Sequence, residues 1–332
     1  MKNPIKNNSK QSSKVTIIGS GAWGLAIAEL LARNNQKVFV FSQYKTEAEN
    51  INEQYSHLTF PISSSNNLKL AIKDSDFIFI VVPSNAVLSV LKSLAQEKIS
   101  HKTRIIICSK GIESKGLQLF SDCVQKELPK NNYAILSGPN FASEVTKLLP
   151  TTTNIASEDK KTALEIVDLL KNDNFLPIIS SDVVSTQIFG SIKNILAIGC
   201  GIIDGLKLGE NAKAALVLKG ILEASLLIKK LGGKAEKSFI SPSGLGDLFL
   251  TCSSKKSRNN SLGCLIGSGK NIKEILSSGK TFEGFHASKS MIQFAKKHQI
   301  TLPLCEKINQ ILQGQFTTKE IKNIISNAIL SN

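Results

Sequence analysis

Several residue types and motifs are scarce in this sequence, and their scarcity limits what the protein can be. Only 6% of its 332 residues are aromatic and only four are histidine. No C-x-x-C pair is present and no histidine lies at a metal-binding spacing, which argues against structural zinc and a disulfide framework. We therefore expect no metal, and we expect free, buried thiols in a reducing compartment for Cys108, Cys123, Cys200, Cys252, Cys264 and Cys305.

Long apolar runs and a secretory leader are also missing. No apolar run approaches the roughly 18 residues that span a bilayer. Residues 1–13 are basic and polar, and the apolar core of a signal peptide does not follow them. We interpret residues 1–13 as a disordered leader and expect a cytoplasmic protein without stable membrane insertion. An apolar content of 42% and a charged content of 20% are typical of a globular protein, and the length suits two domains.

Acidic residues are in the minority. The chain has 41 Lys and Arg against 26 Asp and Glu, a formal net charge of +15. Such an excess suits nucleic acid, an anionic membrane surface or anionic small molecules as partners. The lysines are scattered and form no basic stripe interleaved with aromatic residues, so a solvated, lysine-rich surface explains most of the charge. We expect a small phosphorylated ligand and no nucleic acid.

One stretch near the N-terminus carries a strong signal. The apolar run Val15–Ile18 leads into Gly19-Ser-Gly21-Ala-Trp-Gly24, and a helical pattern rich in alanine and leucine follows. This order is typical of the first βα turn of a dinucleotide-binding unit. In such a unit Gly19 permits the tight turn, Gly21 lets the backbone approach a pyrophosphate, and Gly24 lets helix and strand pack closely. The free N–H groups at the helix N-terminus would bind the pyrophosphate.

The second predicted strand, Lys37–Phe41, ends without the acidic residue that would bind the ribose hydroxyls of NAD. Ser42, Gln43, Tyr44 and Lys45 follow instead. The missing carboxylate favours NADP or the use of both cofactors, with Lys45 as a candidate partner of the 2′-phosphate. An ordinary surface lysine is an equally good interpretation of Lys45.

Polar and glycine-containing segments follow three further apolar runs that are typical of strands buried on both faces. The runs are Asp76–Val82, Arg104–Cys108 and Tyr133–Ser137, and the segments after them are Pro83-Ser-Asn, Ser109-Lys-Gly and Gly138-Pro-Asn-Phe-Ala. In an open parallel sheet, ligands bind at the carboxyl ends of the strands, so we expect the three segments to line one crevice. Turn chemistry alone would explain each segment taken singly.

The strand patterns end near residue 182. Two more runs, Thr153–Ala156 and Phe175–Ile179, are expected to extend the sheet, and helical patterns then follow at 183–200, 211–231, 260–267, 271–277, 283–298 and 304–312. We predict an α/β fold in two parts. Residues 14–182 form an NAD(P)-binding Rossmann-type domain with a doubly wound parallel sheet, and residues 183–332 form a mostly α-helical substrate and catalytic domain.

The catalytic chemistry is expected in the helical half. The pattern over 189–201 is apolar almost all round, so this helix should be buried. A buried lysine such as Lys193 is rare without a role, and a lysine that extends to the surface is the alternative. Gly199 and Gly201 weaken a helix and make sense where another backbone or a ligand comes close.

Two downstream segments add a carboxylate and a phosphate site. Ser243-Gly-Leu-Gly-Asp247 places the carboxylate beside apolar residues, and Ser257-Arg-Asn259 opens a helical segment. Arginine offers phosphate a planar fork and helix N-termini favour anions, although an N-capped helix with a solvated arginine also fits the triplet. Hydride transfer to a ketone needs a proton donor at its oxygen. A dry pocket would lower the pKa of Lys193 for this task, and a nearby Asp247 would oppose that shift.

Eight motifs occur in one order along the chain: GSGAWG, VVPS, SKGIE, SGPNFA, KNILAIG, GLGDL, SRN and Glu283-Gly284. Together they closely resemble the bacterial NAD(P)-dependent glycerol-3-phosphate dehydrogenases, over about residues 14–325. The resemblance implies an oxidoreductase that interconverts dihydroxyacetone phosphate and sn-glycerol 3-phosphate with NAD or NADP and supplies glycerophospholipid synthesis.

The same resemblance implies roles for individual residues, with Lys193 as the catalytic acid/base and Lys110 in contact with both substrate and cofactor. The implied substrate-binding residues are Lys110, Gly138, Asn140, Lys193, Asp247, Ser257, Arg258 and Asn259. The implied cofactor-binding residues are Gly19, Gly21, Ala22, Trp23, Gly24, Gln43, Lys110, Ala142, Arg258, Thr281 and Glu283. Asn140 stands where the family often has serine or threonine, and Gln43 and Thr281 also depart from the common family residues.

Two other functions are weighed against this one. A related hydroxy-acid dehydrogenase of the same two-domain plan is disfavoured, because arginine occurs only at 33, 104 and 258 and leaves no extra carboxylate-binding arginine. A non-catalytic protein that senses nicotinamide or binds nucleic acid would not need Lys193 and Asp247 in apolar settings. The sequence does not determine the oligomeric state, for which a homodimer is one expectation.

Overall fold

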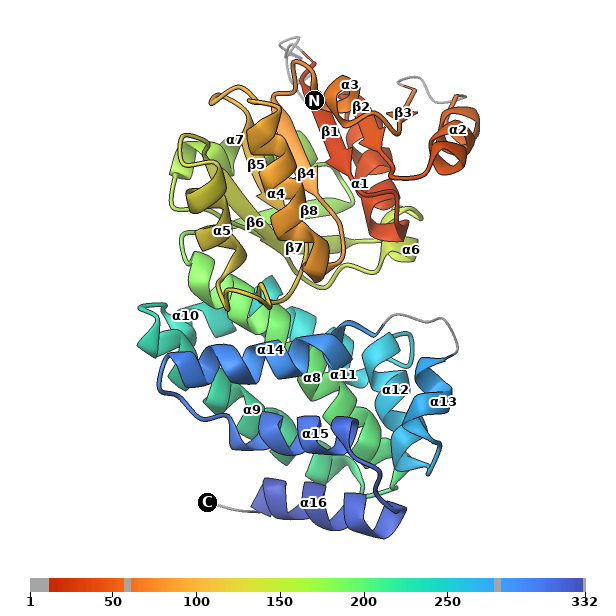
Figure 1. Cartoon of the computed structure of the whole chain (residues 1–332), viewed down its shortest axis with the longest axis vertical. Coiled ribbons are helices and arrows are strands. Elements are labelled where there is room, and N and C mark those ends of the chain that lie inside the picture. The colour runs from red at the N-terminus through yellow and green to blue at the C-terminus, as the bar shows by residue number, and fades with distance from the viewer. Residues whose placement is uncertain (1–11, 57–60, 278–281, 331–332) are drawn as a thin grey trace, which may run out of the picture.

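The computed structural model describes residues 12–56, 61–277 and 282–330, so residues 1–11 of the expected leader lie outside the described part. The chain forms two halves: a β-sheet covered by helices, and below it a stack of helices (Figure 1). The helix α8, Val183–Gly205, begins next to the sheet and runs down through the middle of the helical half.

The sheet of the described chain has eight strands in the order β3-β2-β1-β4-β5-β6-β7-β8. Neighbouring strands are parallel except for β6 and β7. The strands are β1 Lys14–Ile18, β2 Lys37–Phe41, β3 Ser63–Ser65, β4 Phe77–Ile80, β5 Arg104–Ile107, β6 Tyr133–Ser137, β7 Thr151–Ala156 and β8 Phe175–Ser180. The antiparallel β6–β7 pair was not predicted, and neither was β3, because three serines carry no apolar alternation.

Helices cover both faces of the sheet because the central strands are apolar at consecutive positions. Ile17 belongs to a buried cluster with residues of α1 (Ala22–Arg33) and α7 (Lys160–Leu170) on one face, whereas its neighbour Ile18 belongs to a cluster with residues of α4 (Val87–Gln96) and α5 (Phe120–Glu127) on the other. Alternate side chains of a strand point to opposite faces, so a continuous apolar run needs helices on both. The helical segments here are α1 Ala22–Arg33, α2 Lys45–Gln54, α3 Leu68–Ile72, η1 Ser84–Ala86, α4 Val87–Gln96, α5 Phe120–Glu127, α6 Ala142–Val145 and α7 Lys160–Leu170.

The helical half is built around α8, which is buried on all sides and packs against α9, α11, α12 and α14. The remaining segments are α9 Glu210–Lys230, α10 Ala235–Phe239, η2 Pro242–Gly246, α11 Asp247–Ser253, α12 Arg258–Gly267, α13 Ile272–Leu276, α14 Glu283–Lys297, α15 Pro303–Gln313 and α16 Thr318–Leu330. The six predicted helical segments are present. The short helices α10 and α11, the π-helical turn η2 and the helix α16 were not predicted.

Two sequence expectations need correction. Helix α8 is long and apolar enough to cross a membrane by length and composition, although 89% of its most apolar 18-residue window is buried within the protein. Lys193 and Asn194 interrupt the apolar run and hid this property in the sequence. The cysteines are all free and five are buried, but Cys264 is exposed on α12.

Glycines let α8 and α12 approach to backbone contact. A methyl group on Gly201 would lie 2.0 Å from the carbonyl oxygen of Asn260, and one on Gly263 would lie 2.0 Å from that of Ile198. These distances are far below van der Waals contact, so any larger residue would push the helices apart. The predicted close approach at Gly201 is therefore made by another backbone, and it fixes the N-terminus of α12 beside Lys193.

We expect Gly201→Ala to lower the free energy of unfolding by about 3 kcal/mol, the upper end of the usual overpacking cost, because the methyl group meets backbone that cannot rotate away. Thermal unfolding followed by circular dichroism measures the effect. Gly246→Ala is the matched control, since its added methyl would meet its nearest neighbour, the Pro139 ring, at 3.5 Å. Equal melting temperatures for Gly201→Ala and the native protein would contradict the packing argument.

Candidate active site

A cleft of about 550 Å³ lies where the carboxyl ends of the central parallel strands face the helical half. From the sheet, the glycine loop and the segments after β4, β5 and β6 form one wall. From the helical half, α8, α11 and the start of α12 form the other, with Glu283 of α14 at its edge. The three strand-end segments expected to share one crevice therefore do share it.

The glycine loop is shaped to receive a dinucleotide. A methyl on Gly24 would lie 2.1 Å from the carbonyl oxygen of Gly19, so helix and strand pack closely there, whereas a methyl on Gly21 would meet nothing within 4 Å. Gly21 is the N-cap of α1 and supplies no side chain to cap the helix. The first N–H groups of α1 are thus available to an anion such as a pyrophosphate. Ala22 and Trp23 line the cleft beside this helix end.

Two lysines and one aspartate form the centre of the cleft. Nζ of Lys193 donates to Oδ1 of Asp247 at 2.5 Å, and Nζ of Lys110 donates to Oδ2 of the same carboxylate at 2.5 Å. Lys193 also donates to Oγ1 of Thr251 at 3.0 Å, and Lys110 to the carbonyl oxygen of Gly138 at 3.2 Å. Asp247 is only 1% exposed, so it holds both ammonium groups from behind the wall of the cleft.

The pKa values of the two lysines shift in opposite directions, although burial lowers both. Burial lowers the pKa of Lys193 to about 8, because the favourable charge of Asp247 is partly cancelled by the neighbouring Lys110 ammonium. Burial also lowers the pKa of Lys110, but the charge and hydrogen bond of Asp247 outweigh it and leave that pKa raised. Lys110 therefore stays charged, while Lys193 exchanges a proton near neutral pH.

The start of α12 supplies an anion site. Oγ of Ser257, the N-cap, accepts from the backbone N–H of Asn260 at 3.3 Å, which leaves the first two amides of the helix free of this cap. The exposed Arg258 side chain and that of Lys256 line the same part of the cleft. Lys256 is paired with Glu144 at 2.8 Å, so Arg258 is the cation at this helix N-terminus that favours a phosphate group.

Asparagines tie α8, α12 and α14 together at the edge of the cleft. Nδ2 of Asn259 donates to Oδ1 of Asn194 at 3.0 Å, and Nδ2 of Asn194 reaches Oε2 of Glu283 at 3.4 Å. Oδ1 of Asn259 accepts from the backbone N–H of Gly284 at 3.0 Å. This network orients Asn259 and Glu283 relative to Lys193, which precedes Asn194 on the same buried helix.

Comparison with known proteins agrees with this arrangement. A family model described as the N-terminus of NAD-dependent glycerol-3-phosphate dehydrogenase matches residues 14–163, and the model of its C-terminus matches residues 182–323. The chain belongs to this dehydrogenase family. The protein is therefore an NAD(P)-dependent oxidoreductase with a nucleotide cofactor and a small-molecule substrate.

Individual relatives cover nearly the whole chain. Glycerol-3-phosphate dehydrogenase [NAD(P)+] of Fusobacterium nucleatum is 37% identical over 310 residues, 90% of this chain and 92% of the relative. The Bacillus subtilis protein of the same name is 35% identical over 94% of each chain. The crystal structure of glycerol-3-phosphate dehydrogenase from Coxiella burnetii superposes with a TM-score of 0.88 at 33% identity, covering 96% of this chain and 99% of that one.

Most of the residues that the family resemblance implied line the cleft: Gly21, Ala22, Trp23, Gly24, Lys110, Asn140, Ala142, Lys193, Ser257, Arg258, Asn259 and Glu283. Gly19, Gly138 and Asp247 are not among the lining residues, although the buried Gly138 and Asp247 both accept hydrogen bonds from the lining residue Lys110. Gln43 is exposed beyond the end of β2 and is not among the residues lining the cleft, and Thr281 lies outside the described residues.

Asn140 is held by the sheet as well as facing the cleft. Its Oδ1 accepts from Oγ1 of Thr153 at 2.9 Å, and its Nδ2 donates to the carbonyl oxygen of Thr152 at 3.2 Å. One N–H of the amide remains for a ligand. The Asn140 amide thus combines an anchor on the sheet with a place in the lining of the cleft.

Sequence reasoning missed Thr251 and Asn194 as site residues. Thr251 lies one helical turn after Asp247 on α11, where positions i and i+4 share a face, and this spacing was the signal that could have found it. Asn194 follows Lys193 directly, but its partners Asn259 and Glu283 lie far along the chain. Only the fold brings those three together.

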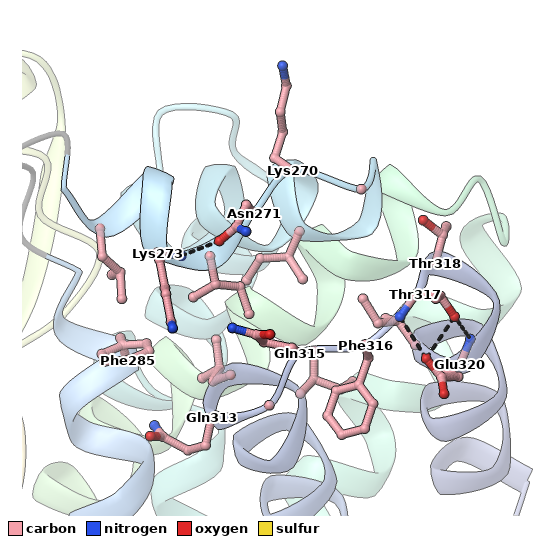
Figure 2. A pocket seen from close by; sticks show the side chains of 18 residues that line it. Lys270, Asn271, Lys273, Phe285, Gln313, Gln315, Phe316, Thr317, Thr318 and Glu320 are labelled. Carbon is pink, nitrogen blue, oxygen red and sulfur yellow. Dashed lines mark hydrogen bonds between the residues drawn. The ribbon is translucent and has the colours of Figure 1, made fainter.

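A second, larger cavity of about 800 Å³ lies in the helical half, between α13, α14 and the segment that joins α15 to α16. Figure 2 shows Lys273 and Gln315 pointing into it, whereas Lys270 points away. None of the described residues that the dehydrogenase family implies for the site lines this cavity. Its greater size does not make it the catalytic site, because the paired lysines and the glycine loop lie elsewhere.

Proposed function

We propose that this protein interconverts dihydroxyacetone phosphate and sn-glycerol 3-phosphate with NAD or NADP, and that it supplies glycerol 3-phosphate for glycerophospholipid synthesis. One observation carries the proposal: a buried lysine of lowered pKa faces a cleft with a dinucleotide-binding loop at one end and an Arg258-bearing helix start at the other. The family assignment and the names of the relatives support the substrate.

The residues of the cleft suit carbonyl reduction. When bound, a reduced nicotinamide supplies a hydride to the carbonyl carbon. As the C=O bond becomes C–O⁻, the Lys193 ammonium stabilises the oxygen and transfers its proton to it. Asp247 holds Lys193 in place, and the Lys110 ammonium keeps the site electropositive. In the reverse direction neutral Lys193 accepts the proton of the alcohol.

Binding at the two ends of the cleft would orient the reactants. We assign the phosphate of the substrate to Arg258, Ser257 and Asn259, and the remaining substrate contacts to Lys110, Gly138, Asn140 and Asp247. We assign the cofactor to Gly19, Gly21, Ala22, Trp23, Gly24, Gln43, Lys110, Ala142, Arg258, Thr281 and Glu283. Phosphate affinity remote from the carbonyl is thereby converted into orientation at the reacting carbon.

We further propose that residues 14–182 act as the NAD(P)-binding domain and 183–332 as the substrate and catalytic domain, a division that the limits of the two family models support. We propose a cytoplasmic homodimer that binds no nucleic acid and inserts into no membrane. Helix α9 supports self-association, because it exposes more than half of Leu218, Leu222 and Leu226, which share one face. Light scattering should give twice the mass of one chain.

A spectrophotometric assay tests the function. Oxidation of NADH or NADPH should depend on dihydroxyacetone phosphate, and pyruvate and other 2-keto acids should not replace it. Turnover with a keto acid instead would favour the hydroxy-acid dehydrogenase. Salt-sensitive retention on DNA without any oxidation of NADPH would favour the non-catalytic protein.

A further inference from the structure

A carboxylate lies beside the glycine loop although none follows β2 directly. Strand β2 ends at Phe41, and Glu47 lies in the first turn of α2. Oγ of Ser20, within the glycine loop, donates to Oε2 of Glu47 at 2.6 Å. Oγ of Ser42, just after β2, donates to the same oxygen at 2.7 Å.

The glycine loop and the end of β2 contact each other, so the Glu47 carboxylate, which binds a serine of each, lies between them. The backbone N–H of Gly19 donates to the carbonyl oxygen of Phe41 at 3.1 Å, and the hydroxyls of Ser20 and Ser42 lie 3.0 Å apart. In a dinucleotide-binding unit, the space between the glycine loop and the end of the second strand receives the adenosine ribose. Glu47 reaches that space from the following helix.

Glu47 is ionised, and one of its two carboxylate oxygens is available to accept further hydrogen bonds. The hydrogen bonds from Ser20 and Ser42 lower its pKa, so it carries its charge throughout the neutral range. Both hydroxyls bind Oε2, and among the described residues Oε1 has no recorded hydrogen-bond partner. The nearby cation Lys45 is directed to Glu49, 3.8 Å away, and its side chain is 75% exposed.

We propose that Glu47 reads the 2′ position of the adenosine ribose and makes the enzyme selective for NADH over NADPH. Its free oxygen accepts hydrogen bonds from the ribose hydroxyls, whereas a 2′-phosphate would bring a second negative charge against a carboxylate that two serines hold in place. Like charges brought together at a binding site lower affinity strongly. The inference rests on the proposed use of a nicotinamide dinucleotide, and it reverses the preference that the sequence around Lys45 suggested.

Trp23, the single tryptophan of the chain, gives a readout independent of activity, because it lies in the wall of the cleft. NADH and NADPH are titrated separately against its fluorescence in the full-length protein. We expect NADH to bind at least about tenfold more tightly than NADPH. In Glu47→Gln, which keeps an acceptor oxygen and loses the charge, we expect the preference to fall to about threefold or less, mainly through tighter NADPH binding.

Glu53→Gln is the matched control, since Glu53 is an exposed carboxylate on the same helix and leaves the Lys45–Glu49 pair intact. Its preference for NADH should match that of the native protein. Equal affinities in the native protein, an unchanged ratio in Glu47→Gln, or an equal change in Glu53→Gln would each overturn the selectivity proposal. A protein whose Trp23 fluorescence responds to neither cofactor would instead contradict the proposed function.

Discussion

Lys193→Ala is expected to lower turnover of dihydroxyacetone phosphate by at least about 10³-fold while the affinity for NADH stays close to the native value. The loss is large because Lys193 would supply both the proton and the charge that stabilises the developing alkoxide. Cofactor binding should persist because the glycine loop lies on the opposite wall of the cleft. Steady-state kinetics and the fluorescence of Trp23 measure the two effects separately. Lys289→Ala, at an exposed lysine on α14, is the control and should keep full activity.

The pH dependence provides a second, independent readout of Lys193. Carbonyl reduction needs the protonated amine, so kcat/KM should be constant at low pH and decline above the Lys193 pKa of about 8. Alcohol oxidation needs the neutral amine and should rise with pH until that value. Asp247 raises the pKa of Lys193, so Asp247→Asn should move both profiles to lower pH. Retained turnover in Lys193→Ala, or profiles that do not move in Asp247→Asn, would exclude Lys193 as the acid.

Arg258→Ala is expected to raise KM for dihydroxyacetone phosphate and lower kcat/KM about 10- to 100-fold, the range of one lost charged hydrogen-bond pair, with a smaller change in kcat. The physical reason is that Arg258 supplies a fork for the phosphate at the start of α12. Arg33→Ala is the matched control, because Arg33 is an exposed arginine paired with Glu29 on α1.

Dihydroxyacetone, which lacks the phosphate, serves as a second substrate. It distinguishes the loss of a phosphate contact from a structural disturbance of the variant. If Arg258 acts on the phosphate, the native protein and Arg258→Ala should reduce this poor substrate at similar rates. A loss of equal size with both substrates would mean that the substitution disturbs α12 rather than a phosphate contact. An unchanged KM would contradict the assignment of the phosphate to Arg258.

Local patterns in the sequence were sufficient for most of the fold. Consecutive apolar residues such as Ile17 and Ile18 predict strands buried on both faces, and these strands form the centre of the sheet. The direction of β7 was not predictable in this way, because an apolar run has the same pattern in either direction. Strand β3 was missed for the opposite reason, since its register on β2 is fixed by backbone pairing and not by apolar side chains.

The sequence by itself determined the βα turn at Gly19–Gly24, the two-part order of strands and helices, and the candidate residues Lys193, Asp247 and Arg258. These follow from local rules of backbone freedom, apolar periodicity and charge. Only the tertiary structure decided which groups share a carboxylate, how far each lysine pKa moves, and that Glu47 lies against Ser20. Those properties depend on distance and burial between residues remote in the chain, and no local pattern encodes them.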